Sequence, residues 1–193
     1  MLRIGVFGGT FNPPHRGHLR LAEMVRERFG LDRVLWIPNS RSPFKTGEEL
    51  ADAADRLAMV RAATAGNAAF SVSEIETRQG GTSYTVETLR KLQEAHPGAA
   101  FRLMVGSDQL PGFSRWREPE EIVRRAPLIV FPRAGYEQAA VPEGFGKYVE
   151  FADTPLIELS GTNIRERIRT GRSVREMVPP AVLEIIAKRG LYR

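Results

Sequence analysis

The sequence predicts a single α/β domain over residues 1–193, with a Rossmann-like, doubly wound parallel sheet and C-terminal helices. First, apolar runs of strand length alternate with segments of helical periodicity along the chain. Second, the runs that begin at Leu2, Ala100 and Leu128 are apolar enough along their length to be central strands covered on both faces. Third, 193 residues suit one core, and no repeat, low-complexity tract or domain boundary interrupts them.

The first half of the chain predicts three strands and three helices. An apolar strand leads through a glycine-rich turn into a helix that begins near His18 and stops at Gly30. The strands are expected at 2–7, 33–38 and 70–75, and the helices at 18–29, 52–65 and 82–96, with a polar loop at 39–49. Apolar spacing indicates inward faces made by Leu21, Met24, Val25 and Phe29, by Ala53, Leu57, Val60 and Thr64, and by Val86, Leu89 and Leu92.

The second half predicts three more strands and the C-terminal helices. Strands are expected at 100–105, 127–132 and 148–151, helices at 118–126, 162–170 and 180–189, a short helix or turn carrying Trp116, and a loop at 133–146. In an open parallel sheet, ligands bind beyond the carboxyl ends of the strands. That rule gathers Gly8–His18, Asn39–Lys45, Gly106–Trp116 and Arg133 around one cleft.

The turn after the first strand has the composition of an anion site. It reads Gly8-Gly9-Thr10-Phe11-Asn12-Pro13-Pro14-His15-Arg16-Gly17-His18. Paired glycines let backbone N–H groups approach a bound group, two prolines stiffen the turn, and the following helix directs its positive end at the same place. His15 and His18 add two imidazoles three residues apart.

The residues of this turn have other interpretations. A glycine-rich turn after a first strand is common in α/β proteins, and it does not by itself indicate phosphate. Two histidines could form half of a zinc site, but zinc usually takes three or four protein ligands, the chain has no cysteine, and His96 lies at a helix end. We therefore expect no metal site made by protein side chains. The turn also lacks the G-x-x-x-x-G-K-[ST] and G-x-G-x-x-G spacings.

Charge and composition exclude several classes of protein. The 28 Lys plus Arg exceed the 23 Asp plus Glu, which gives +5, but most basic residues alternate with acids as on a solvated helix face. Arginines concentrate around 115–125 and 165–175 and could attract polyphosphate, yet no aromatic series accompanies them, so no nucleic acid partner is expected. No apolar run suits a membrane span or a signal core, which predicts a cytoplasmic protein with no membrane partner. Homo-oligomer formation stays open.

A second motif lies near the C-terminus, at Ser160-Gly161-Thr162-Asn163-Ile164-Arg165. Ser160 or Thr162 can cap the following helix, whose first N–H groups then face outward, and Arg165 lies one turn in, where its guanidinium can fork onto phosphate oxygens. An ordinary N-cap with a solvated arginine is the alternative. Gly161 is expected to change little.

Together the two motifs carry a resemblance to a known family. The first resembles the HxGH signature of the nucleotidyltransferase superfamily, and the second resembles the Ser-x-Thr-x-Ile-Arg phosphate site of bacterial nicotinate mononucleotide adenylyltransferases. The likeness covers essentially the full length, including the closing residues 190–193. It implies transfer of the adenylyl group of ATP to nicotinate mononucleotide by direct in-line attack. The products are nicotinate adenine dinucleotide and pyrophosphate, and Mg²⁺ is carried by the ATP phosphates.

The resemblance also implies a role for individual residues. The catalytic set is His15, His18 and Arg165, with His18 as the donor to the transition state. The ATP-binding set adds Gly8, Gly9, Thr10, Phe11, Gly106, Asp108, Ser160 and Thr162. The substrate-binding set comprises Asn39, Lys45, Tyr84, Thr85, Asp108, Trp116, Arg117 and Arg133, with a backbone amide near Thr85 receiving the nicotinate carboxylate and the Trp116 indole stacking on the pyridine ring.

Three departures from the family pattern limit what is carried over. Phe44 replaces the histidine of a Pro-His-Lys pattern in the family, and Ala134 replaces the proline of an Arg-Pro-Gly pattern. Arg117 replaces the tyrosine that often follows the tryptophan in the family. Phe44 could remove a contact to substrate phosphate, and Arg117 could favour an acid substituent on the ring. Two alternatives stay open: another transferase of the superfamily, such as phosphopantetheine adenylyltransferase, and a nucleotide-binding sensor without catalysis. The preference between acid and amide mononucleotides is also undecided.

Overall fold

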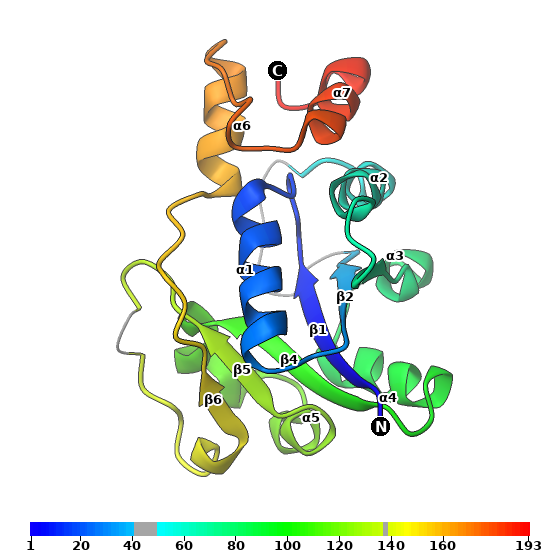
Figure 1. The fold of residues 1–193 in the computed structure, drawn as a ribbon, viewed down its shortest axis with the longest axis vertical. Helices are drawn as coiled ribbons and strands as arrows, with labels where there is room; N and C mark the ends of the chain where they lie inside the picture. The colour runs from blue at the N-terminus through cyan, green and yellow to red at the C-terminus, as the bar shows by residue number, and fades with distance from the viewer. Residues whose placement is uncertain (41–49, 137–138) are drawn as a thin grey trace.

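A computed structural model describes residues 1–40, 50–136 and 139–193 (Figure 1). Its centre is a six-stranded sheet in the order β3-β2-β1-β4-β5-β6, in which every neighbouring pair is parallel. The strands are β1 (Arg3–Gly9), β2 (Arg33–Pro38), β3 (Phe70–Val72), β4 (Ala100–Gly106), β5 (Leu128–Phe131) and β6 (Val149–Phe151). The chain order reverses between β1 and β4, which makes their carboxyl ends the topological switch point where such sheets bind ligands.

Helices connect the strands and close the chain. The α-helices are α1 (Arg16–Arg28), α2 (Ala53–Thr64), α3 (Ile75–Gln79), α4 (Thr85–Ala95), α5 (Pro119–Arg125), α6 (Gly161–Arg169) and α7 (Pro180–Arg189). Two 3₁₀ segments are η1 (Ser107–Arg115) and η2 (Gly146–Tyr148). Among the described residues, no helix is long and apolar enough to cross a bilayer.

The two faces of the sheet bury separate apolar clusters, because successive strand side chains point to opposite faces. Ile4 and Val6 of β1 join the cluster covered by α4 and α5, whereas Phe7 joins the cluster covered by α1. In α1 the buried face is made by Leu21, Ala22 and Val25. The predicted doubly wound sheet is therefore confirmed, with helices packed against both faces (Figure 1).

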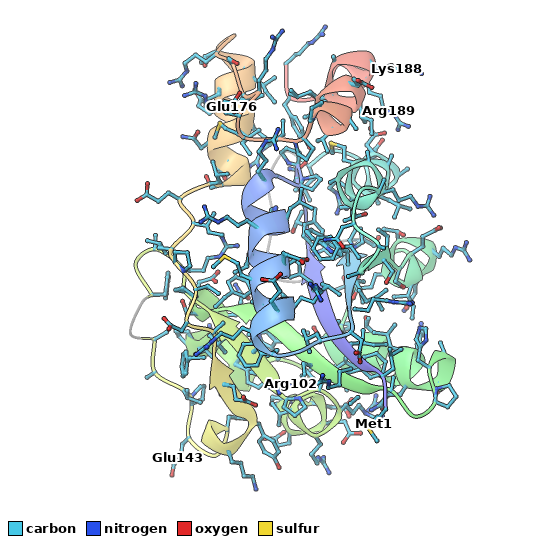
Figure 2. The ribbon with its side chains drawn as sticks, in the orientation of Figure 1. Met1, Arg102, Glu143, Glu176, Lys188 and Arg189 are labelled. Carbon is cyan, nitrogen blue, oxygen red and sulfur yellow. The ribbon has the colours of Figure 1, made fainter. Side chains whose placement is uncertain are left out.

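The C-terminal helices form a third cluster beyond the carboxyl ends of the strands (Figure 1). Ile164 of α6 and Val182 of α7 pack there against Met59 of α2. On the surface of the same region, Arg189 of α7, labelled in Figure 2, pairs with Asp55 of α2. This packing brings α6, from the end of the chain, to the loop that follows β1.

Three details of the sequence prediction are corrected. Ile75 is the first residue of α3 rather than part of a strand, and β3 ends at Val72. The helix expected near His18 begins at Arg16, because the His15 ring caps it. Met24 is only half-buried, since the inward stripe of α1 passes through Ala22 and Val25 instead.

Candidate active site

A cavity of about 790 Å³ opens at the switch point between β1 and β4. It is lined by the loop after β1, the end of β4, the segment before α4, the residues around Trp116 and the start of α6. All predicted site residues within the described part of the chain line it; Lys45 and Phe44 lie outside that part. The lining members of the predicted sets are Gly8, Gly9, Thr10, Phe11, His15, His18, Asn39, Tyr84, Thr85, Gly106, Asp108, Trp116, Arg117, Arg133, Ser160, Thr162 and Arg165.

The two histidines of the HxGH loop (residues Gly8–His18) cap α1 reciprocally. The backbone N–H of His18 donates to Nδ1 of His15 at 3.3 Å, and the backbone N–H of His15 donates to Nδ1 of His18 at 3.2 Å. An Nδ1 that accepts a hydrogen bond carries no proton, so this pattern assigns the proton of each ring to Nε2. Each imidazole therefore keeps its N–H donor at Nε2, and both residues line the cavity.

His15 is held in its neutral form. Its ring is buried and lies 3.6 Å from that of His18, centroid to centroid, in a stacked arrangement. Burial and, secondly, the nearby Arg133 cation lower the pKa of His15 from 6.5 to about 3. At neutral pH this residue can donate a hydrogen bond to phosphate but brings no formal charge.

Aromatic packing fixes the middle of the HxGH loop. The Phe11 ring packs against Phe7, His18 and Trp36 with centroids 5.2 to 5.5 Å apart. Its backbone φ is 48°, in the left-handed region that non-glycine residues rarely adopt. The buried ring therefore holds a turn that brings the backbone of Gly9 and Thr10 to the cavity.

The second motif meets the first directly. Ser160 is the N-cap of α6, and its Oγ accepts from the backbone N–H of Asn163 at 3.2 Å. Arg165, one turn into the helix, donates from Nη1 to the carbonyl oxygen of Asn12 at 2.9 Å and from Nη2 to Oγ1 of Thr162 at 3.4 Å. Two segments 153 residues apart are thus joined at the rim of one cavity.

Gly161 matters more than the sequence suggests. A Cβ atom at this position would lie 2.9 Å from the carbonyl oxygen of Asn12 and 3.4 Å from Nη1 of Arg165. Backbone atoms cannot move aside as a flexible side chain can. The lack of a side chain at Gly161 therefore permits α6 to approach the HxGH loop, a role that its variable position in the motif does not indicate.

The far side of the cavity is built around the start of α4. The Arg117 guanidinium lies 4.8 Å from the Tyr84 ring centroid and pairs with Glu87 at 2.7 Å.

Glu76 of α3, which also lines the cavity, accepts a hydrogen bond from Oγ1 of Thr88 at 2.7 Å. Burial raises the pKa of Glu76, and the hydrogen bonds oppose that rise. The half-buried Trp116 lines the cavity while packing on Phe113, with ring centroids 5.3 Å apart.

Asp108 and Arg133 meet over the end of β4. Their closest charged atoms, Oδ1 and Nε, are 3.8 Å apart, and Gln109 donates to the other carboxylate oxygen at 2.7 Å. A Cβ at Gly106 would lie 2.2 Å from Oδ1 of Asp108. A glycine at the end of β4 is what lets this carboxylate fold back beside the strand.

Sequence reasoning missed two residues that support the site. Arg56 of α2 is only 1% exposed, and its guanidinium binds the carbonyl oxygens of Thr10 and Asn39. The hydroxyl of Tyr192 donates to Oδ1 of Asn12 at 2.7 Å. Helical periodicity could not identify Arg56, since its partners lie on distant segments. For Tyr192, the only signal was its place in the closing residues that resemble the family.

The acidic groups of the site do not form a metal centre. Within residues 1–40, 50–136 and 139–193, no three His, Cys, Asp or Glu side chains gather closely enough to hold an ion. A divalent cation would therefore need most of its ligands from a bound substrate.

The chain resembles known proteins along its length. The model of the cytidylyltransferase-like family matches residues 6–167. A relative from Salinibacter ruber, named "Probable nicotinate-nucleotide adenylyltransferase", is 48% identical over 100% of this chain and 98% of its own length. A relative of the same name from Gloeobacter violaceus is 40% identical over 98% of this chain and 96% of its own length.

Solved structures share the fold. The nicotinic acid mononucleotide adenylyltransferase of Plasmodium falciparum, solved in complex with NaAD, superimposes with a TM-score of 0.78. The match covers 100% of this chain and 98% of that one at 17% identity, so it bears on architecture alone. Sequence and fold agree, and the chain belongs to the cytidylyltransferase-like family, among its nicotinate-nucleotide adenylyltransferases.

Proposed function

We propose that this protein transfers the adenylyl group of ATP to nicotinate mononucleotide, which yields nicotinate adenine dinucleotide and pyrophosphate, as a step of NAD biosynthesis. One observation carries the proposal: the hydrogen bond from Arg165 to the carbonyl of Asn12 joins both phosphate motifs at one cavity. The names of the full-length relatives supply the substrates.

The reaction needs positioning and charge stabilisation more than covalent chemistry. A phosphate oxygen of the mononucleotide attacks the α-phosphorus of ATP in line with the departing pyrophosphate, so one P–O bond forms as another breaks. The Nε2–H groups of His18 and His15 donate to the phosphate oxygens on which negative charge grows. Arg165 and the N-terminus of α6, capped by Ser160, hold the β and γ phosphates.

In this proposal Mg²⁺ is bound to the phosphates of ATP. Asp108 and Glu76 are the carboxylates among the described residues that line the cavity, and they lie on different elements. This donor set fits a cation that arrives with the triphosphate and neutralises part of its charge.

The acceptor end of the cavity suits a nicotinate ring. The backbone at Tyr84 and Thr85, at the start of the 11-residue helix α4, offers N–H groups to a carboxylate. Trp116 offers a flat face to a cationic pyridinium, and Arg117 adds positive charge beside it. The contacts to the ribose and the phosphate of the mononucleotide are then left to Asn39, Asp108 and Arg133. Lys45 and the cytoplasmic location stay predictions from the sequence.

Steady-state kinetics test the proposal. Pyrophosphate release is measured with MgATP and a panel of acceptors, namely nicotinate mononucleotide, nicotinamide mononucleotide and phosphopantetheine, with MgCTP as a control donor. We expect the acid mononucleotide with ATP to give the highest kcat/KM, and mass spectrometry to identify the dinucleotide. His18→Ala, purified in parallel, controls for contaminating enzyme. Turnover only with phosphopantetheine, or ATP binding without any turnover, would overturn the proposal.

A further inference from the structure

A buried guanidinium lies directly behind the HxGH loop. Arg56 of α2 does not line the cavity, yet Nη1 donates to the carbonyl oxygens of Thr10 and Asn39, both at 2.8 Å. Nη2 donates to the carbonyl of Ser40 at 2.8 Å, and Nε donates to that of Ala51 at 3.0 Å. The cation is therefore satisfied by backbone dipoles from three separate stretches of chain.

These bonds determine which way two peptide groups face. In a trans peptide the C=O and N–H bonds point in opposite directions, and the only cis bond among the described residues is Asn12-Pro13. Because the carbonyl of Thr10 faces Arg56, the N–H of Phe11 points away from Arg56. Both Thr10 and Phe11 line the cavity. Arg56 thus sets the direction of the Thr10–Phe11 peptide group in the HxGH loop.

The second oriented peptide serves the acceptor end. The carbonyl of Asn39 faces Arg56, so the N–H of Ser40 points the other way, where it donates to Oγ of Ser83 at 3.3 Å. Ser83 begins the segment that leads into α4 and lines the cavity. One guanidinium therefore reaches both ends of the site through the backbone.

Arg56 also orients a side chain of the site. Nη1 lies 3.3 Å from Oδ1 of Asn39, which directs the amide Nδ2 of Asn39 to Oγ1 of Thr10 at 3.4 Å. Thr10 accepts in that bond, so its hydroxyl proton points elsewhere. The cation thus acts on Thr10 twice, through its carbonyl and through its side chain.

We propose that Arg56 is a positioning residue that aligns the ATP-phosphate loop and the acceptor segment at the same time, without touching either substrate. The inference rests on the proposed function for the identity of the two substrates. A lysine cannot reproduce it, since an ammonium is a compact donor without the planar fork that reaches carbonyls in several directions. An error of about 1 Å in the placement of reacting groups can cost about 100-fold in rate.

Arg56→Lys tests the proposal, and Arg61→Lys is the matched control on the same helix, because Arg61 is exposed and pairs with Glu74. We expect Arg56→Lys to lower kcat/KM roughly 10- to 100-fold for ATP and for the mononucleotide alike, per folded molecule. Part of the loss should appear in kcat, since alignment is needed in the transition state. Arg61→Lys should retain wild-type kinetics.

Circular dichroism counts the folded molecules, because it does not depend on the loop whose alignment is under test. If Arg56→Lys is partly unfolded, the kinetics are measured in sucrose, which favours the compact state. A purely structural role would leave kcat and both KM values of the folded fraction unchanged, and that result would overturn the inference. A loss confined to one substrate would also overturn it. An inactive wild-type protein would instead contradict the proposed function.

Discussion

Replacing His15 with asparagine should make the protein more resistant to acid. The folded chain holds this imidazole neutral, because burial, followed by the Arg133 charge, lowers its pKa from 6.5 to about 3. Between those pH values the unfolded chain binds a proton at the ring and the folded chain does not. Stability is therefore lost as the pH falls below 6.5. Asparagine keeps an acceptor at the N-cap of α1 and removes the titrating group.

The size of the effect follows from the two pKa values. Linkage gives a penalty at this ring of about 0.8 kcal/mol at pH 6 and about 3.3 kcal/mol at pH 4. Wild type should therefore lose about 2.5 kcal/mol more than His15→Asn over this interval. Above pH 7 the order should reverse, since the smaller side chain leaves part of a buried site unfilled.

Urea denaturation followed by circular dichroism at pH 4, 5, 6 and 7.5 measures this difference. The slope with urea should be the same for both proteins, so that midpoints report stability. His96→Asn removes an exposed imidazole and controls for the loss of a histidine as such. If the wild-type and His15→Asn stabilities run parallel from pH 6 to pH 4, His15 is not held neutral and its assigned role as an uncharged donor is wrong.

Four further outcomes are expected. His18→Ala should lower kcat roughly 100- to 1000-fold with little change in ATP affinity; a kcat within about threefold of wild type would refute its role. Gly161→Ala should raise the KM for ATP, because its Cβ would lie 2.9 Å from the carbonyl oxygen of Asn12; unchanged kinetics would show that α6 can shift. Tyr192→Phe should destabilise the fold by about 1 kcal/mol in urea through loss of the bond to Asn12. Excess EDTA should stop turnover but leave the melting temperature of the ligand-free protein unchanged, whereas a fall would reveal a cation held by the protein.

Local chemistry made much of the fold predictable. Alternating apolar runs and helical spacing located β2 at 33–38 and α7 at 180–189 with the observed bounds, the latter closed by Gly190 at a φ of 61°. The HxGH loop and the motif at residues 160–165 were also visible, because each is a short stretch in which a turn or cap, a helix start and polar side chains occur together. Each of these patterns and motifs is contained within about ten consecutive residues, so the sequence alone is enough to recognise it.

What the sequence did not reveal depends on contacts between distant segments. Arg56 lies beside Leu57 on the inward side of α2, where periodicity expects an apolar residue, and only the carbonyls of Thr10, Asn39, Ser40 and Ala51 make its burial tolerable. Gly161 looked unimportant because it falls at a variable position of the motif that this segment resembles. Its partner is a backbone oxygen at position 12.

The neutral state of His15 bears on where the site obtains its positive charge. Four arginines line the cavity within the described residues, and the carboxylic acids beside them are Asp108 and Glu76. Burial raises the pKa of Glu76. The arginines outnumber the two carboxyl groups, so the balance of side-chain charge around the cavity is positive. Permanent guanidinium charges and backbone N–H groups keep that balance at any pH near neutrality, whereas imidazolium ions would not. In the proposed mechanism the HxGH histidines therefore act as oriented donors, set by their own capping of α1, within a field that arginines supply.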